Sequence, residues 1–234
     1  MHACYVLHTR PFRNTSLLLE LFSDAGGRLP VVARGIRGSR PGMQGSLRPF
    51  TPLLADWRGR GEVKTLSGVE ASAPPLPLTG ARLYCGLYLN ELLMRLLPRD
   101  DPHERVFGYY AQCLRALAEA RDVERELRLF EKRLLDELGY GLVLDREAET
   151  GRAIEAERRY VYQAEAGAIP APANGHPMPS VHGATLLSLA AEALDDPRSL
   201  AEARGLMRVV LAHHLGDRPL RSRELFRQEA TDAR

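Results

Sequence analysis

A stiff, proline-rich segment divides the sequence into two parts whose apolar residues follow different periods. The segment Ala73–Leu78 contains Pro74, Pro75 and Pro77, which neither a helix interior nor a central strand accommodates. Apolar residues alternate in short runs before it and recur with the period of a helix after it. We therefore predict an α+β chain, with a β-rich domain over residues 1–79 and a mostly helical domain over residues 80–234.

The first part predicts about five short strands. Ser23–Gly27 ends in two glycines and has the composition of a reversing turn, and Arg58–Gly61 predicts a second one. Pro49 and Pro52 would confine the strand that contains them to an edge or a bulge. Five short strands in so small a domain favour a small barrel or sandwich, with the OB-fold among the candidates. The expected extended segments are residues 4–9, 15–22, 29–33, 47–57 and 62–69.

The second part predicts helices around an irregular insertion at about 140–180. The segment 82–97 is apolar nearly all round, as expected of a central buried helix. Ser199 and Glu202 have the spacing of a capping box at a helix start. Within the insertion, residues 158–163 predict a strand, and several prolines indicate a long loop. The expected helices are residues 82–97, 103–119, 124–138, 183–194 and 199–214, with a short last one beginning at Ser222.

Positive charge is concentrated in the first part. The formal net charge is only +2, but residues 1–80 hold ten basic and five acidic residues, whereas the rest hold 22 and 25. Between residues 28 and 60 there are seven arginines and one acid, Asp56. This asymmetry points to nucleic acid or another polyanion as the partner of the first domain. A GC-rich genome would also favour arginine, which supplies 30 of the 32 basic residues.

The arginines of the first domain are candidates for phosphate contacts, because guanidinium groups match phosphate geometry. Phe12, Phe50 and Trp57 are candidate platforms for unpaired bases, although a small barrel also needs aromatic core residues. We expect Phe22 and Phe50 in the core. The candidate nucleic-acid-binding residues are Arg34, Arg37, Arg40, Arg48, Trp57, Arg58, Arg60 and Lys64.

The predicted helix 124–138 combines an apolar stripe with basic side chains. Residues 121, 125, 128 and 132 would line one face if the helix began early enough. Such a surface suits an acidic-hydrophobic peptide tail. The alternative is a solvent face of salt bridges, since Glu124 and Asp136 have suitable spacings. The candidate partner-binding residues are Arg121, Arg125, Arg128 and Lys132.

The sequence contains no motif of the common catalytic classes, such as G-x-S-x-G, a Walker loop or H-E-x-x-H. The cysteines Cys4, Cys85 and Cys113 are odd in number and far apart, which is typical of buried free thiols in a reducing cytoplasm. No apolar run is long enough to span a membrane, and the start lacks a secretory pattern. We expect a cytoplasmic protein that is not an enzyme.

Five segments in order resemble the RecO family of bacterial DNA repair and recombination proteins. The first is LHTRPFRNTSLLLELFSDAGGRLPVVARGIRGSR, and the others are LRPFTPLLADWRGRGEVKTL, LYCGLYLNELLMRLLP, RLFEKRLLDELGYGL and PLRSRELFRQ. The resemblance covers residues 5–145 and 216–228 and is weakest over 146–215. It implies an amino-terminal OB-fold and a carboxy-terminal helical domain.

The resemblance also implies a recombination mediator of the RecF pathway. Such a protein binds single- and double-stranded DNA, anneals complementary strands, engages the tail of the single-stranded DNA-binding protein (SSB), and with RecR helps load RecA. Many family members carry a cysteine-ligated zinc module after a Gly-Tyr-Gly segment, but Gly139–Gly141 is followed by residues 142–151 without a cysteine. We therefore expect no metal and no cofactor, with residues 146–170 held by side-chain packing or partly mobile. The alternatives are a metal-dependent nuclease and an RNA-binding barrel protein of translation.

Overall fold

The structure is a computed structural model that describes residues 1–36, 45–172, 178–222 and 224–225. The chain forms two compact units. The first comprises residues 1–121 together with the segment that starts at Leu220, and the second comprises residues 122–219. The proline segment 73–78 lies within the first unit, where it connects the strands to the helices that follow.

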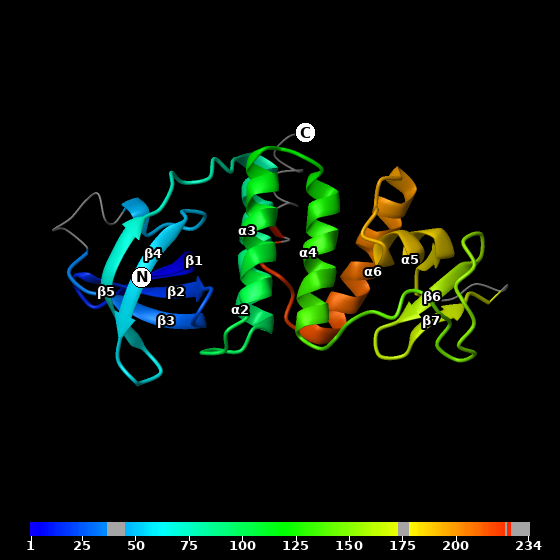
Figure 1. Cartoon of the computed structure of the whole chain (residues 1–234), viewed down its shortest axis with the longest axis horizontal. Helices are drawn as coiled ribbons and strands as arrows, with labels where there is room; N and C mark the ends of the chain where they lie inside the picture. Colours follow the sequence, from blue (N-terminus) through cyan, green and yellow to red (C-terminus); the bar gives the residue numbers. More distant parts are fainter. Residues whose placement is uncertain (37–44, 173–177, 223, 226–234) are drawn as a thin grey trace. The chain divides into compact units, whose positions relative to one another are not determined.

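A closed barrel in the first unit is built from β1 (His2–Phe12), β2 (Ser16–Ser23), β3 (Gly27–Ala33), β4 (Leu53–Arg58) and β5 (Lys64–Ala71). The strand order is β1-β2-β3-β5-β4, and only β3 and β5 pair in parallel (Figure 1). An OB-like barrel followed by a helical region confirms the predicted fold class.

Strand β2 and residues 4–7 of β1 are buried on both faces. Side chains such as Cys4 and Val6 point into the barrel core, whereas Tyr5 and Phe22 pack outside it against Phe107, at ring-centroid distances of 5.8 and 5.5 Å. This double burial explains why these strands read as nearly continuous apolar runs rather than as clean alternation. The expected burial of Phe22 and Phe50 is confirmed, and the three cysteines are buried free thiols, as predicted.

The helices α2 (Gly80–Leu96) and α3 (Glu104–Ala118) pack beside the barrel in the same unit (Figure 1). The β1–β2 register shifts between Val6 and His8, so Leu7 lies at a bulge. The buried Asn90 amide donates to the Leu7 carbonyl at 2.9 Å and accepts from the Tyr110 hydroxyl at 2.6 Å. One asparagine thus connects the bulge of β1 to both helices.

Two long-range contacts secure the ends of this unit. The Arg82 guanidinium donates to the carbonyls of Leu117 and Ala118, at the carboxyl end of α3, where a cation is favourable. The Glu91 carboxylate accepts hydrogen bonds from the backbone N–H groups of Arg221 and Ser222, both at 2.9 Å. This carboxylate therefore attaches the returning carboxy-terminal segment to α2.

The second unit combines three helices with a small sheet. Its strands pair in the order β7-β6-β8, and β7 and β8 are short enough to escape a sequence-based prediction. The elements are α4 (Val123–Glu137), β6 (Arg159–Gln163), β7 (Gly167–Pro170), β8 (Ser180–His182), α5 (Gly183–Ala190) and α6 (Pro197–Leu215).

Polar contacts hold the segment that follows Gly139–Gly141. The Glu147 carboxylate is buried and accepts from the Thr150 hydroxyl at 2.5 Å and the Arg158 guanidinium at 3.2 Å. The backbone N–H of Gly151 also donates to the Glu147 carbonyl at 3.0 Å. Among the described residues, no group of three or more His, Cys, Asp or Glu side chains is arranged to hold a metal ion.

Some predicted element boundaries were wrong. Helix α6 begins at Pro197 with Asp196 as its cap, whose carboxylate accepts from the Ser199 N–H at 2.8 Å. Ser199 is therefore not the cap, because an Asp followed by Pro at the first helical position makes the stronger start. Strand β4 begins only at Leu53, after both prolines of the segment predicted to be extended.

Two further differences concern the end of β1 and the last predicted helix. Strand β1 continues through Pro11 to Phe12, where the sequence predicted an interruption. A proline is tolerated there because it lies close to the tip of the β1–β2 hairpin. The short helix predicted from Ser222 lies partly outside the described residues.

Candidate nucleic-acid interface

The candidate arginines of the predicted basic loop and of the segment after it are in part exposed and in part outside the described residues. Arg34 directly follows β3 and is exposed. Arg37 and Arg40 lie outside the described residues. Arg48 is exposed in the segment that leads to β4, and the Thr9 hydroxyl donates to the adjacent Leu47 carbonyl at 3.4 Å. This contact places Arg48 beside the distal part of β1.

Strand register brings Arg34 to the same end of the barrel as the β1–β2 turn. Leu17 pairs with Pro11 on one side and with Ala33 on the other. Phe12 and Arg34 each lie one residue beyond this row, so their backbones are about 10 Å apart, which is two strand spacings. We call the described segments 8–16, 33–36 and 45–52 the arginine end of the barrel.

Two arginines at the arginine end were absent from the sequence-based candidates. Arg10 and Arg13 are both exposed and flank Pro11-Phe12 at the hairpin tip. The available signal was the Arg-Pro-Phe-Arg sequence at a predicted strand end. This signal is weak because Arg10 and Arg13 lie apart from the dense run of arginines between residues 28 and 60.

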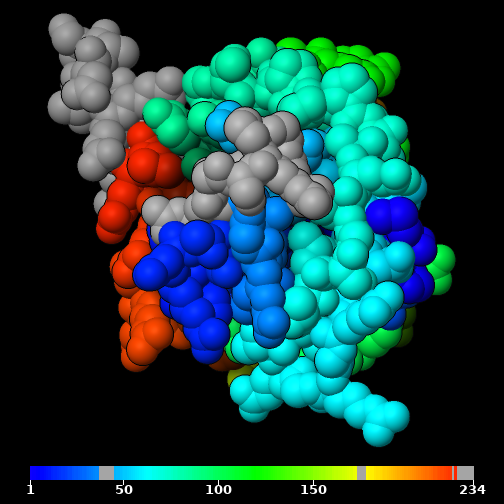
Figure 2. All heavy atoms as spheres, turned by 90° about the vertical axis from the view of Figure 1, so that its left-hand side faces the viewer, coloured from blue at the N-terminus to red at the C-terminus, as the bar shows by residue number. Residues whose placement is uncertain are grey.

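The arginine end carries uncompensated positive charge. Its described segments contain four arginines and no acidic residue, and none of the four guanidiniums pairs with a carboxylate of the described chain. Figure 2 shows this face, with the β1–β2 tip in dark blue and the end of β3 beside it in a lighter blue. Four free guanidiniums on one surface can bind several phosphates without competing with internal anions. They are Arg10, Arg13, Arg34 and Arg48.

The remaining basic candidates of the barrel lie on β4, on β5 and in the turn between them, away from the arginine end. Along the barrel, Arg58 is level with Val32, two residues before Arg34, and Lys64 is level with Val31. The β4–β5 turn with Arg60 lies beyond them, further from the arginine end. Arg58 and Arg60 are exposed, whereas the Lys64 ammonium pairs with Asp100 at 3.0 Å. The basic residues that the sequence analysis treated as one cluster therefore form two groups, one at the arginine end and one on and around the β4–β5 turn.

Trp57 belongs mainly to the barrel. Its side chain packs against the barrel core, close to Gly26, and its ring lies 5.3 Å from that of His2. It remains half-buried. Only part of the indole is available as a stacking surface.

Arg28 shows how internal partners remove an arginine from the binding surface. Its guanidinium donates to the Met94 carbonyl at 2.6 Å and pairs with Glu20 at 3.3 Å. Burial lowers the pKa of this guanidinium, and Glu20 offsets part of that effect. Arg99 also pairs with Glu20, at 3.2 Å. Arg28 therefore connects β3 to β2 and to α2 and is not available to a ligand.

A shallow hollow of about 380 Å³ opens beside the arginine end, between the segment before β4 and the proline linker. The Thr51 hydroxyl is buried within its lining and has no hydrogen-bond partner among the residues that the structure describes. The other lining residues are Gly45, Ser46 and residues 71–75.

The four candidate partner-binding cations do not form one face. Arg121 precedes α4, between two residues with positive φ, and pairs with Glu119 in the first unit. Arg128 is buried, with its guanidinium 2.7 Å from the Glu131 carboxylate. The early helix start that would align the four side chains is wrong, since α4 begins at Val123.

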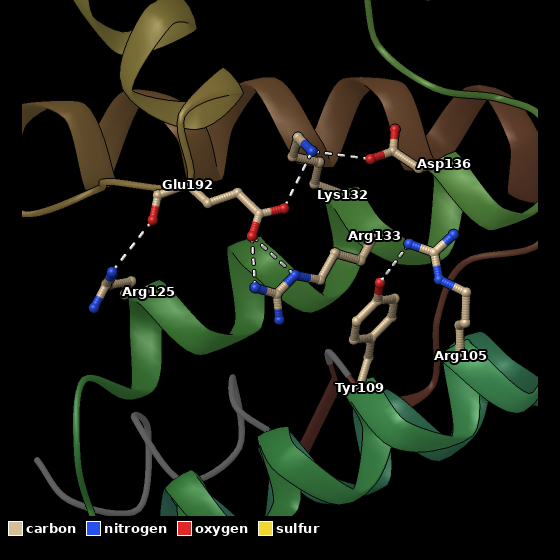
Figure 3. Close-up of polar contacts among 7 residues, drawn as sticks. All are labelled: Arg105, Tyr109, Arg125, Lys132, Arg133, Asp136 and Glu192. Carbon is tan, nitrogen blue, oxygen red and sulfur yellow. Dashed lines mark hydrogen bonds and ion pairs between the residues drawn. The ribbon is translucent and has the colours of Figure 1, made fainter.

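The other two cations join a cluster around Glu192, which Figure 3 shows. The Glu192 carboxylate accepts from Lys132 at 3.3 Å and from Arg133 at 3.1 Å, and its backbone carbonyl accepts from Arg125 at 3.2 Å. Lys132 also donates to Asp136 at 2.9 Å. The hydrogen bond from Arg133 is the main reason that the pKa of Glu192 is lowered. Internal carboxylates thus neutralise this surface, as the salt-bridge alternative expected.

An apolar hollow of about 560 Å³ lies on the same unit, along α6. Pro197 and Leu200 contribute apolar surface, and Arg204 and Arg208 contribute positive charge. Glu124, also in its lining, pairs with Arg204 at 3.3 Å rather than with Arg128. The hollow offers apolar and basic groups side by side.

Two family models match the chain, one on each side of residue 76. The family model described as Recombination protein O N terminal matches residues 2–75, and the one described as Recombination protein O C terminal matches residues 77–224. The chain belongs to the recombination protein O family. The two matches meet in the proline segment.

Relatives of the family align over nearly the whole chain. The DNA repair protein RecO of Methylococcus capsulatus is 49% identical over 226 residues, which cover 97% of this chain and 92% of that protein. The DNA repair protein RecO of Pseudomonas aeruginosa is 48% identical, over 96% of this chain and 93% of its own. The described helices of this family member include none that is long and apolar enough to cross a membrane.

Proposed function

We propose that this chain is a DNA-binding recombination mediator that acts without catalysing a reaction itself. The observation that carries the proposal is the arginine end, where four exposed guanidiniums have no carboxylate partner among the described residues. Phosphate binding of this kind is strong, largely independent of sequence and sensitive to salt. The names of the relatives, DNA repair protein RecO, support DNA as the polyanion.

Strand annealing follows from the same surface. Two complementary strands repel each other through their phosphates, and a protein surface that neutralises both lowers this repulsion. Arg34 and Arg48 would hold one strand at the arginine end. Arg58 and Arg60 would contact a second strand or a longer path of the first. Arg37 and Arg40 remain proposed contacts that lie outside the described residues.

The helical part would supply the protein partner surface. We propose that it binds the acidic-hydrophobic tail of SSB, and that with RecR the chain helps load RecA in the cytoplasm. The α6 hollow supports this partner class, because it combines Leu200 with Arg204 and Arg208. Arg125 and Lys132 would contribute only if the tail competed with Glu192 for them.

The salt dependence of binding tests the DNA-binding part. Each phosphate contact to a single strand contributes about 0.7 to the slope of log affinity against log salt. Replacing Arg34 and Arg48 together with Ala should therefore lower that slope by about 1.4. The matched control replaces Arg152 and Arg198, two exposed arginines of the second unit, and should leave the slope unchanged.

The measurement is fluorescence anisotropy of a labelled oligonucleotide at several salt concentrations. Equal slopes for the wild type and the Arg34/Arg48 variant would remove this surface from the binding site. Cleavage of the oligonucleotide that requires magnesium would contradict the non-enzymatic proposal.

Annealing of SSB-coated complementary oligonucleotides tests the partner surface. Annealing should fall when SSB lacks its last residues. Full annealing with truncated SSB would contradict a tail-binding role.

A further inference from the structure

The tip of the β1–β2 hairpin holds an arginine side chain over an aromatic ring. The Arg13 guanidinium lies 5.3 Å from the centroid of the Phe12 ring. Phe12 is half-buried and Arg13 is exposed. The Arg13 guanidinium forms no ion pair with a described residue.

The backbone at this tip is conformationally costly for an arginine. Arg13 has a φ of 52°, in the left-handed region that favours glycine. The turn itself does not require a side chain at this position. The side chain that is present, however, lies over the neighbouring ring at cation–π distance and is exposed to solvent.

A flat, exposed guanidinium on an aromatic ring is a stacking surface for another planar group. Guanidinium planes and aromatic rings both stack on nucleobases. Arg10, Arg34 and Arg48 surround this tip and would hold the adjacent phosphates. A base in a duplex is already stacked and paired, so only an unpaired base can occupy such a surface.

We propose that Phe12 and Arg13 form the stacking site for one unpaired nucleobase, and that this site makes the arginine end prefer single strands to duplex. The proposal rests on the DNA-binding function proposed above. The arginines and the tip then have separate roles. Phosphate contacts supply affinity for single strands and for duplex, and base stacking at the tip supplies the preference for single strands.

A second arginine–aromatic pair in the same unit provides a matched control. On α3, the Arg105 guanidinium lies 5.9 Å from the Tyr109 ring centroid and donates to its hydroxyl at 3.0 Å, as Figure 3 shows. As at the tip, the arginine is exposed and the aromatic residue is half-buried, but this pair sits on a helix, outside the arginine end. Any effect of cation–aromatic stacking on general stability would appear equally in both pairs.

The test compares the affinities of Phe12→Leu, Arg13→Gly and Tyr109→Leu for a single strand and for a duplex of equal length. Leucine keeps the apolar packing at position 12, and glycine accepts the positive φ at position 13. Phe12→Leu should weaken single-strand binding by about 5- to 100-fold, the range for one stacked base, and duplex binding by less than about twofold. Arg13→Gly should act in the same direction, and Tyr109→Leu should change neither.

Abasic oligonucleotides link this effect to a base rather than to the backbone. The loss caused by Phe12→Leu should disappear on a single strand that lacks its bases. With 2-aminopurine in the strand, the wild type should quench its fluorescence more than Phe12→Leu does.

The outcomes separate the two proposals. If the wild type binds neither single strand nor duplex, the proposed function fails. If the wild type binds but Phe12→Leu lowers single-strand and duplex affinity equally, the stacking site is overturned and the DNA-binding function stands. A selective loss seen instead with Thr51→Val would place the base in the hollow beside the linker and also overturn the assignment to the tip.

Discussion

Replacing Asn90 with Ala should be among the most destabilising single substitutions in the first unit. Its side chain is only 1% exposed, and its amide bridges the Leu7 carbonyl and the Tyr110 hydroxyl. The substitution removes the donor of one buried group and the acceptor of another. Burial raises the pKa of Tyr110 well above its usual value, so its hydroxyl stays protonated as a donor.

The magnitude follows from the two hydrogen bonds. A buried polar group that loses its partner costs about 1–3 kcal/mol, so Asn90→Ala should lower the free energy of unfolding by about 2–5 kcal/mol. Tyr110→Phe removes only the shorter bond and should cost about 1–2 kcal/mol. The double variant should be less destabilised than the sum of the singles, because both remove the same bond.

Urea unfolding followed by tryptophan fluorescence provides the assay. Trp57 is the single tryptophan and packs against the barrel core, so its emission reports on this unit. Gln112→Ala, which removes an exposed amide from α3, serves as the control and should change stability by less than about 0.5 kcal/mol. A value for Asn90→Ala as small as that of the control would refute the argument that this amide holds the bulge to the helices.

Three further predictions address the turn, the ion-pair cluster and a thiol. Gly27→Ala should destabilise by several kcal/mol, since its Cβ would meet the Asp101 carbonyl oxygen at 1.9 Å, whereas Gly35→Ala, with a similar positive φ and open space, should cost only about 1 kcal/mol in thermal unfolding. Because the pKa of Glu192 is held below its usual value of 4.5, its contribution to stability is fully present above about pH 4.5 and is lost as pH falls through the lowered pKa. The stability difference between wild type and Glu192→Gln in urea should therefore shrink on acidification, and a constant difference would contradict the ion-pair argument. Burial raises the pKa of Cys4 to about 12, so mass spectrometry should find it alkylated at about pH 8 only after denaturant is added, and labelling of the native protein would refute its burial.

Local patterns were sufficient for the architecture. The change of hydrophobic period at residues 73–78 falls between the barrel strands β1–β5 and helix α2, because the side-chain directions of strands and helices are properties of neighbouring residues. The errors fell where two local signals competed. Asp196 and Ser199 are both good caps, and only the observed bond from the Ser199 N–H to Asp196 shows which one starts the helix.

The candidate interface was only partly predictable. The position of Arg34 in an exposed basic loop follows from the sequence, but the membership of Arg10 and Arg13 does not. They are separated from Arg34 by more than twenty residues, and the register of three strands places them at one end of the barrel. On α4, Arg128 is buried and Arg125 is half-buried, a difference that no spacing reveals.

The sequence by itself determined the order of the elements, the proline linker and the positive charge of the first part, since each depends on residue type and near neighbours. Only the tertiary structure decided which arginines are available to a ligand. Arg28 is occupied by Glu20 and by a carbonyl from α2, whereas Arg34 has no carboxylate partner among the described residues. The reason is that ion pairs and hydrogen bonds act through space over a few ångströms, and the fold alone sets which distant residues come that close.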